Sequence, residues 1–326
     1  MGSGTWSADV YDDKVRSCAV AGISSFNYSD SGLHADTHPD LDARGLDGKG
    51  AVRESRDSTE HPLSTPVAVL FDVTGSMRDV PRHLQAKLPQ LLGLLLRKGY
   101  VTDPQILFGA IGDATCDRAP LQVGQFESDN RMEDHLGNLL LEGGGGGGMR
   151  ESYELALWFA ARRVVTDAWE KRGSRGFLFL VGDEMAYRRV SRAEVERFTG
   201  ETVQADIPLE EILAEVQQKW DVYYLLPGAA SHSGNAEVAE FWRGLLGQNF
   251  IEVPDTDAVP ETIALTIGLA EGVTDLDAGL ADIEDVGSAA GPAVAKALAL
   301  VGSAAGSVAV AAPPGDLDAP SGNTRL

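Results

Sequence analysis

The sequence is poor in several residue types, and each shortage excludes a class of protein. Its 326 residues include only two cysteines, Cys18 and Cys116, which lie far apart and outside any C-x-x-C pattern. This argues against a disulfide framework and against a zinc site, and it makes a reducing cytoplasm the expected setting. The first residues also lack the basic start and the apolar stretch of a signal peptide.

Positive charge is scarce as well. The chain has 27 Lys and Arg against 49 Asp and Glu, a formal net charge of −22. Nucleic acid is therefore not expected as a partner, because phosphate contacts need clustered basic residues. One stretch, residues 293–312, is long enough to consider as a membrane span, but Ala, Gly and Ser dominate it. We expect a helical tail or a partner-docking segment there, and no membrane contact.

Composition divides the chain into three parts. Residues 1–63 are polar and predict an extended arm, whose aromatics, such as Trp6 and Phe26, could pin parts of it onto a neighbouring surface. Residues 64–272 carry the apolar runs of a folded domain. Residues 273–326 turn to Ala, Gly, Ser and Asp and predict an acidic tail.

Short apolar runs alternate with helical patterns through the central part. Runs typical of buried strands cover residues 67–71, 105–112, 177–181, 221–226 and 250–253, with a shorter, edge-type strand at 121–126. A leucine-rich helix is predicted from Pro81 to Gly99, with a kink or a boundary at Pro89. This alternation predicts an α/β fold with a doubly wound, mostly parallel, Rossmann-like sheet flanked by helices.

The loop after the first of these strands carries the spacing D-x-T-x-S. Asp72, Thr74 and Ser76 put one carboxylate and two alcohol oxygens on a tight loop, a suitable cradle for a hard divalent cation. Asp183 follows the run at 177–181, and loops at the carboxyl ends of parallel strands meet at one edge of the sheet. Such an oxygen-only set favours Mg²⁺ or Mn²⁺, with Ca²⁺ as the third candidate, over Zn²⁺.

The segment DVTGSM after VAVLF resembles the metal-ion-dependent adhesion site of von Willebrand factor A (vWA) domains. In that family a second loop contributes a Thr and a third loop an Asp, and Asp183 falls where the third-loop residue is expected. The second loop here, GGGGGGMRESYELAL, has no Thr and offers Glu151 or Ser152. Glu151 would add a negative charge, whereas Ser152 would preserve the usual chemistry. The resemblance covers roughly residues 64–270 and implies the bacterial and phage intracellular branch.

Simpler explanations exist for parts of this pattern. The D-x-T-x-S loop could be a capped turn without metal. No Gly-Lys-Ser/Thr follows the glycine run at 143–148, so it is not a Walker loop, and a flexible flap or spacer is expected. The basic cluster Arg188, Arg189 and Arg192 is expected to pair with the acidic surface of the protein itself.

Three functions fit these residues. The first is a non-enzymatic, metal-dependent binding module that acts as a scaffold or adaptor and offers its cation to a partner's carboxylate. The second is a phosphohydrolase of the haloacid-dehalogenase type, although that motif needs a second carboxylate where this chain has Thr74. The third is a structural or assembly protein in which the metal staples loops. The resemblance also implies partnership with chaperone-like ATPases or with proteins of a stress or phage-conflict system.

Overall fold

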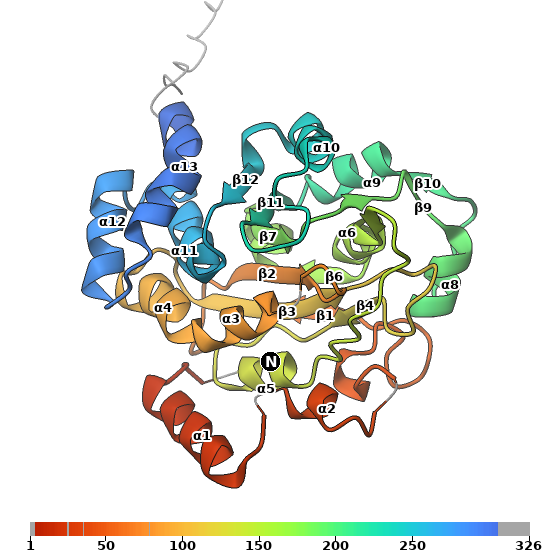
Figure 1. Ribbon diagram of the computed structural model, residues 1–326, viewed down its shortest axis with the longest axis horizontal. Coiled ribbons are helices and arrows are strands. Elements are labelled where there is room, and N and C mark those ends of the chain that lie inside the picture. The colour runs from red at the N-terminus through yellow and green to blue at the C-terminus, as the bar shows by residue number, and fades with distance from the viewer. Residues whose placement is uncertain (1–3, 25, 35, 78, 306–326) are drawn as a thin grey trace, which may run out of the picture.

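A six-stranded sheet forms the centre of the molecule (Figure 1). The computed structural model describes residues 4–24, 26–34, 36–77 and 79–305. From one edge to the other, the strands are β12 (Phe250–Val253), β11 (Trp220–Pro227), β7 (Gly176–Val181), β2 (Thr65–Asp72), β3 (Pro104–Ile111) and β4 (Leu121–Val123). All neighbours are parallel except β3 and β4. Chain order changes direction at β2, which is the doubly wound arrangement, so the predicted fold class is confirmed.

Side chains along the central strands point alternately to the two faces of the sheet and form two hydrophobic cores, one on each face. In β2, Val67, Val69 and Phe71 pack into the first core, while Ala68 and Leu70 pack into the second. Successive side chains of a strand point to opposite faces, so a strand covered on both sides needs an unbroken apolar run. This is why the sequence predicts the core strands well.

Helices cover both faces. The first core lies under α3 (Val80–Ala86), α4 (Leu88–Leu92), the π-helical turn η2 (Gly93–Arg97), α5 (Arg131–Gly137) and α11 (Val259–Ala270). The second lies under α6 (Tyr153–Arg162), α8 (Arg192–Thr199), α9 (Leu209–Val216) and α10 (Ala236–Leu246). The predicted leucine-rich helix is divided at Lys87, between α3 and α4, because Pro89 has no N–H to donate to the carbonyl oxygen four residues earlier, that of Gln85.

Residues 1–63 contain more regular structure than an extended arm. They form α1 (Ala8–Ala21), α2 (Asn27–Asp30), the 3-10 turn η1 (Pro39–Leu41) and β1 (Arg53–Ser55), which pairs with β6 (Val164–Thr166). Tyr11 and Phe26 are buried in the first core, and the Trp6 indole donates to Glu133 Oε1 over 2.9 Å. The aromatics therefore attach this segment to the domain.

The first half of the predicted tail is also part of the body. It forms α12 (Leu276–Asp285) and α13 (Gly291–Ala305), and Ile283, Val294 and Leu298 are buried in the first core. Residues 306–326 lie outside the described residues. Within the described part of the chain, no helix is long and apolar enough to cross a membrane.

Several short elements complete the fold. They are α7 (Asp167–Arg172), β5 (Arg150–Glu151) paired with β8 (Met185–Ala186), β9 (Arg189–Val190) paired with β10 (Ile207–Pro208), and the turns η3 (Gly247–Asn249) and η4 (Thr256–Ala258). Arg188 lies 4.0 Å from Glu210, and Arg189 lies 3.6 Å from Asp206. The expected pairing with the protein's own acidic surface is thus confirmed for these two arginines.

Candidate metal centre

The loop after β2 gathers the oxygens of the D-x-T-x-S pattern. Thr74 donates to Asp72 Oδ1 twice, from its hydroxyl over 2.6 Å and from its backbone N–H over 2.8 Å. The hydroxyls of Thr74 and Ser76 are 3.2 Å apart. Asp72 and Thr74 are buried, whereas Ser76 is half-buried and faces the outside. The loop therefore presents a short row of oxygens from a buried carboxylate toward the surface.

Asp183 joins this row from the neighbouring strand. It lies two residues beyond β7, and its Oδ1 accepts a hydrogen bond of 2.7 Å from the Ser76 hydroxyl. Its Oδ2 accepts from the backbone N–H of His232, over 2.9 Å, in the loop after β11. Two loops 107 residues apart in sequence thus meet at the carboxyl edge of the sheet.

The spacing of these oxygens fits a shared cation. Along the row from Asp72 through Thr74 and Ser76 to Asp183, neighbouring oxygens are 2.6, 3.2 and 2.7 Å apart. Two oxygens at right angles on one Mg²⁺, each about 2.0–2.1 Å from the ion, lie about 2.9 Å from one another. Each hydroxyl in the row donates its one proton to a carboxylate, Thr74 to Asp72 and Ser76 to Asp183, and these two hydrogen bonds hold the row without an ion.

A tyrosine below the loop completes the surroundings of Asp72. Tyr153, at the start of α6, donates to Asp72 Oδ2 over 2.9 Å. Its hydroxyl fills the place that a Cβ at Gly182 would need, only 1.8 Å away. Burial, above all, raises the pKa of Asp72 to about 7, against the lowering effect of the hydrogen bonds from Thr74 and Tyr153. The D-x-T-x-S pattern gave no sign of this tyrosine.

The two second-loop candidates point in different directions. The Ser152 hydroxyl accepts from the backbone N–H of Ala114 over 2.9 Å, and so holds the loop after β3. Glu151 is buried, and its Oε2 has no hydrogen-bond partner among the described residues. Burial raises the pKa of Glu151, and the charge of Asp72 is the next largest cause. Of the two, Glu151 is the side chain that interacts with the Asp72 loop.

The glycine run lies directly over this loop. Gly143 donates from its backbone N–H to Val73 O over 3.2 Å, and Gly144 O accepts from Gly75 N–H over 3.1 Å. Gly145 N–H donates to Asp117 Oδ1 over 3.1 Å. We call residues 143–147 the glycine strap. They connect the D-x-T-x-S loop to the loop after β3, in place of the flap or spacer that the sequence suggests.

The acidic groups of the loop after β3 are already bound by protein donors. Asp113 accepts from the Thr115 backbone and hydroxyl and from the Tyr187 hydroxyl, and Asp117 accepts from the Asp113 backbone N–H. In the described chain, no group of three or more His, Cys, Asp or Glu side chains is arranged to hold a metal ion. A metal at the Asp72 loop would therefore depend on the Thr74 and Ser76 hydroxyls.

In the part of the chain that the structure describes, which leaves out Arg78, cationic side chains do not neutralise the candidate centre. Among the described residues, no Lys or Arg forms an ion pair with Asp72, Asp183 or Glu151. The Nε2 of His232 lies 3.6 Å from Glu184 Oε1. Burial and Asp72 raise the pKa of Glu184. Several carboxyl groups with raised pKa values in one place fit a bound cation, which would favour their ionised forms.

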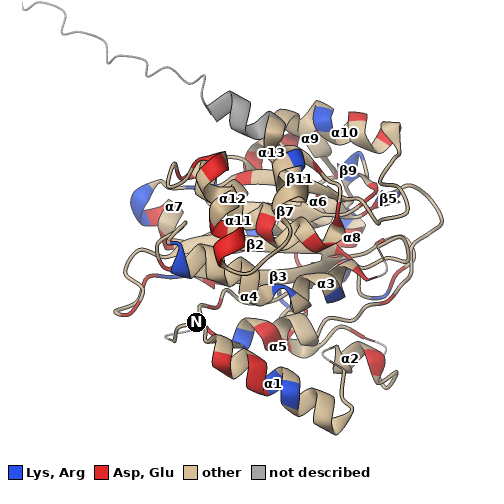
Figure 2. Cartoon of the chain, turned by 60° about the vertical axis from the view of Figure 1, so that its left-hand side comes forward, with Lys and Arg blue, Asp and Glu red and all other residues tan. Residues whose placement is uncertain are grey.

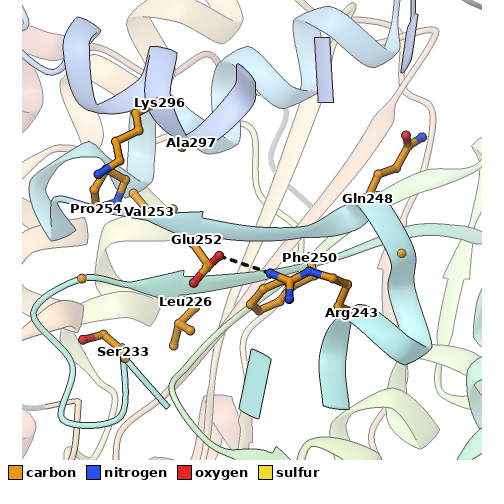
Figure 3. Close-up of a pocket in the computed structure, with 13 residues that line it drawn as sticks. Leu226, Ser233, Arg243, Gln248, Phe250, Glu252, Val253, Pro254, Lys296 and Ala297 are labelled. Atoms are coloured by element: carbon orange, nitrogen blue, oxygen red, sulfur yellow. Dashed lines mark hydrogen bonds and ion pairs between the residues drawn. The ribbon is translucent and has the colours of Figure 1, made fainter. Parts of the chain in front are cut away.

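A separate cavity of about 540 Å³ lies along the edge strand β12, between α10 and α13 (Figure 3). Arg243 and Glu252 form an ion pair of 3.2 Å at its wall, and Lys296 projects toward it from α13. Gly228 and Ser233 of the loop after β11 also line it. None of the six predicted site residues lines this cavity.

Comparison with known proteins gives a limited result. No protein-family model and no curated protein matches the chain. Among solved structures, it is similar to the pilus adhesin SpaC from Lactobacillus rhamnosus GG, with a TM-score of 0.43 and 8% identity over 67% of this chain and 32% of SpaC. The vWF domain of the type V pili tip protein Mfa5 from Porphyromonas gingivalis gives a TM-score of 0.43 and 10% identity, over 64% of this chain and 96% of that domain.

A third similar structure is proximal thread matrix protein 1 from the mussel byssus, with a TM-score of 0.42 and 10% identity over 63% of this chain and 47% of that one. The chain thus spans about a third of the length of SpaC. These TM-scores are too low to establish the fold class, which follows instead from the strand order of the chain's own sheet. The protein has an α/β fold with a six-stranded, mostly parallel sheet.

Proposed function

We propose that the chain is a metal-ion-dependent protein-binding module, a scaffold or adaptor in a bacterial or phage protein complex. Asp72, Thr74, Ser76 and Asp183 would hold Mg²⁺ or Mn²⁺, with Ca²⁺ as the third candidate. The observation that carries the proposal is the row of four side-chain oxygens from two loops, in which neighbouring oxygens are 2.6 to 3.2 Å apart.

The bound ion would serve to recognise a partner protein. A bound divalent cation offers a strongly electrophilic position to an oxygen ligand, and a partner's carboxylate is the ligand of highest charge. Ser76 is the only one of the four that is not fully buried, so such a ligand would approach from its side. Glu151 would add negative charge behind the ion.

A non-enzymatic role is supported by Thr74. A haloacid-dehalogenase-type phosphohydrolase needs a second carboxylate two residues after the first, as its general acid and base. Here the hydroxyl at that position is committed to Asp72 Oδ1. Partnership with a chaperone-like ATPase, or with a stress or phage-conflict protein, is an extension of the proposal that comes from the vWA resemblance alone.

Thermal unfolding with and without metal tests the proposal. In EDTA-treated protein, millimolar Mg²⁺ or Mn²⁺ should raise the Tm, and Asp72→Ala should abolish the shift. A ligand present at 100 times its Kd adds about 2.7 kcal/mol of stability. Ser76→Ala serves as a milder second variant in case Asp72→Ala does not fold.

Asp221→Ala provides the matched control. This carboxylate lies at the other end of β11 and pairs with Arg175 over 2.9 Å. The variant should keep the metal-dependent shift. Absence of any shift in wild-type protein at millimolar metal would overturn the proposal, and turnover of a phosphate ester that is lost in Asp72→Ala would replace it with the phosphohydrolase function.

A further inference from the structure

A pair of arginines stacks on one aromatic ring close to the candidate metal centre. The guanidinium carbon of Arg188 lies 4.8 Å from the centre of the Phe241 ring, and that of Arg150 lies 5.7 Å from it. Phe241 comes from α10 and is 9% exposed, so the ring is held in place by its own packing. We call Arg150, Arg188 and Phe241 the arginine platform. Cation–π contacts of this kind keep both guanidinium groups in defined positions.

The platform is connected to the metal centre by strand pairing. Arg150 is opposite Met185 in the β5–β8 pair, and its guanidinium donates to Ala186 O. Met185 is two residues after Asp183, a distance of about 7 Å along an extended chain. Arg150 and Glu151 are successive strand residues, so their side chains leave opposite faces of β5, Glu151 inward and Arg150 toward Phe241.

Charge makes the platform unusual in this molecule. Asp and Glu are spread over several helices, α1, α10 and α12 among them (Figure 2), and the net charge is −22. Arg150 has no carboxylate partner among the described residues. Arg188 has only Glu210, at 4.0 Å, and both of those side chains are more than 60% exposed. Other arginines, such as Arg172 on Asp57, form close ion pairs.

We propose that the arginine platform binds a second acidic group of the same partner segment whose first carboxylate binds the metal ion. This inference deepens the proposed function and rests on it. Guanidinium groups prefer carboxylates as planar, bidentate partners. An extended segment advances about 3.3 Å per residue, so a short stretch of it can present both acidic residues. The partner is therefore an extended acidic peptide segment.

Binding of a labelled hexaglutamate peptide, measured by fluorescence anisotropy in Mg²⁺ at fixed ionic strength, tests this inference. Hexaglutamine is the uncharged control peptide. Hexaglutamate should bind more tightly, and Arg150→Glu should weaken its binding about tenfold while the Mg²⁺-dependent Tm shift stays in place. Arg97→Glu changes the net charge equally at an exposed position on η2, and it should weaken binding by less than twofold.

The outcomes distinguish failure of the arginine platform from failure of the proposed metal centre. Equal losses in Arg150→Glu and Arg97→Glu would show that overall charge alone governs binding, and so would equal binding of the two peptides; either result overturns the platform. A Tm shift that persists in Asp72→Ala would instead overturn the metal centre. Support requires that Asp72→Ala loses both the Tm shift and tight peptide binding, whereas Arg150→Glu loses only the latter.

Discussion

Asp72 owes its position to a residue outside the D-x-T-x-S pattern. Tyr153 is fully buried and donates to Asp72 Oδ2, while its hydroxyl is 3.4 Å from that of Tyr224. Tyr224 in turn donates to Glu184 O over 2.9 Å. Through these tyrosines, the loops that follow β2 and β7 are joined beneath the candidate metal centre.

We expect Tyr153→Phe to destabilise the protein by about 1–3 kcal/mol, because it leaves one oxygen of a buried carboxylate without a partner. Urea unfolding of the two proteins in EDTA measures the difference. Tyr223→Phe is the comparison, since Tyr223 packs on Phe179 and has no hydrogen bond to the centre. Equal stability of Tyr153→Phe and wild type would contradict this account.

Glu151 and Ser152 differ in what their substitution should change. Glu151→Gln removes the carboxylate that a bound cation would keep ionised beside Asp72, so the midpoint of the Mg²⁺-dependent Tm shift should move to a higher concentration, by about tenfold for each 1.4 kcal/mol of lost interaction. Ser152→Ala removes the acceptor for Ala114 N–H and should lower the Tm without moving that midpoint. The opposite result would identify Ser152 as the metal ligand.

For single residues, spacing in the sequence predicts which side chains meet at the ends of strands, and little else. Asp72, Thr74 and Ser76 could be found because they share one loop, and Asp183 because it ends a parallel strand. The role of Tyr153 depends on how α6 packs against β7, and no local pattern reports that. The need for glycine at position 182 could not be predicted for the same reason, because it arises from the Tyr153 hydroxyl, which occupies the place of a Cβ.

Among the elements, the glycine strap is the one whose sequence was most ambiguous. Six successive glycines predict neither helix nor strand, and a loop without side chains can only be placed by its backbone contacts. Those contacts are with Val73, Gly75 and Asp117. The two-residue strands β5 and β8 were missed for a related reason, because a pair of this length has no periodicity to detect.

Gly144→Ala should displace the glycine strap, since a Cβ at this position would lie 2.0 Å from Asp117 Oδ1. We expect a lower Tm and a weaker Mg²⁺-dependent shift, because the strap also holds the D-x-T-x-S loop through Gly75 N–H. Gly148→Ala is the matched control, with only the Arg150 backbone nitrogen near the added Cβ, at 4.0 Å. If the two variants behave alike, the strap has no structural role.

The segments on either side of the predicted domain show how composition misleads about elements. Residues 1–63 are polar overall, yet Tyr11 and Phe26 are enough to seat them on the first core. Alanine-rich α13 was expected as part of a tail, but Val294 and Leu298 are fully buried. A few apolar residues at helical spacing decide whether a segment packs, and average composition conceals them.

For the whole molecule, buried carboxylates dominate the response to pH. Burial raises the pKa of Asp72 to about 7, and it also raises those of Glu154 and Glu261. An acid whose pKa is raised on folding keeps its proton in the native state after the unfolded chain has released it. Its contribution to stability is therefore complete below the unfolded pKa, near 4, and is lost as the pH rises toward the folded pKa.

The metal-free protein should therefore be more stable at pH 5.5 than at pH 7.5, as measured by urea unfolding in EDTA. Each buried acid still protonated in the native state makes the free energy of unfolding fall by about 1.4 kcal/mol per pH unit. Glu261 offers one such group outside the candidate metal centre: its side chain is fully buried, and its Oε1 accepts from Ser288 over 2.5 Å and lies 4.0 Å from Lys87 Nζ.

Glu261→Gln keeps the oxygen that accepts from Ser288 and removes the titration, so its stability should fall less steeply between pH 5.5 and 7.5 than that of wild type. Added Mg²⁺ should also make the stability of the wild type depend less on pH near pH 7, because a cation at Asp72 stabilises the ionised carboxylate that the metal-free fold disfavours. A wild-type stability that rises across this range would overturn this expectation, because surface ion pairs cannot produce such a rise; an example is the pair of Arg172 and Asp57, in which the pKa of Asp57 is lowered to about 2. Because those pairs are fully ionised above pH 5.5, we expect their contribution to be constant where that of the buried acids declines.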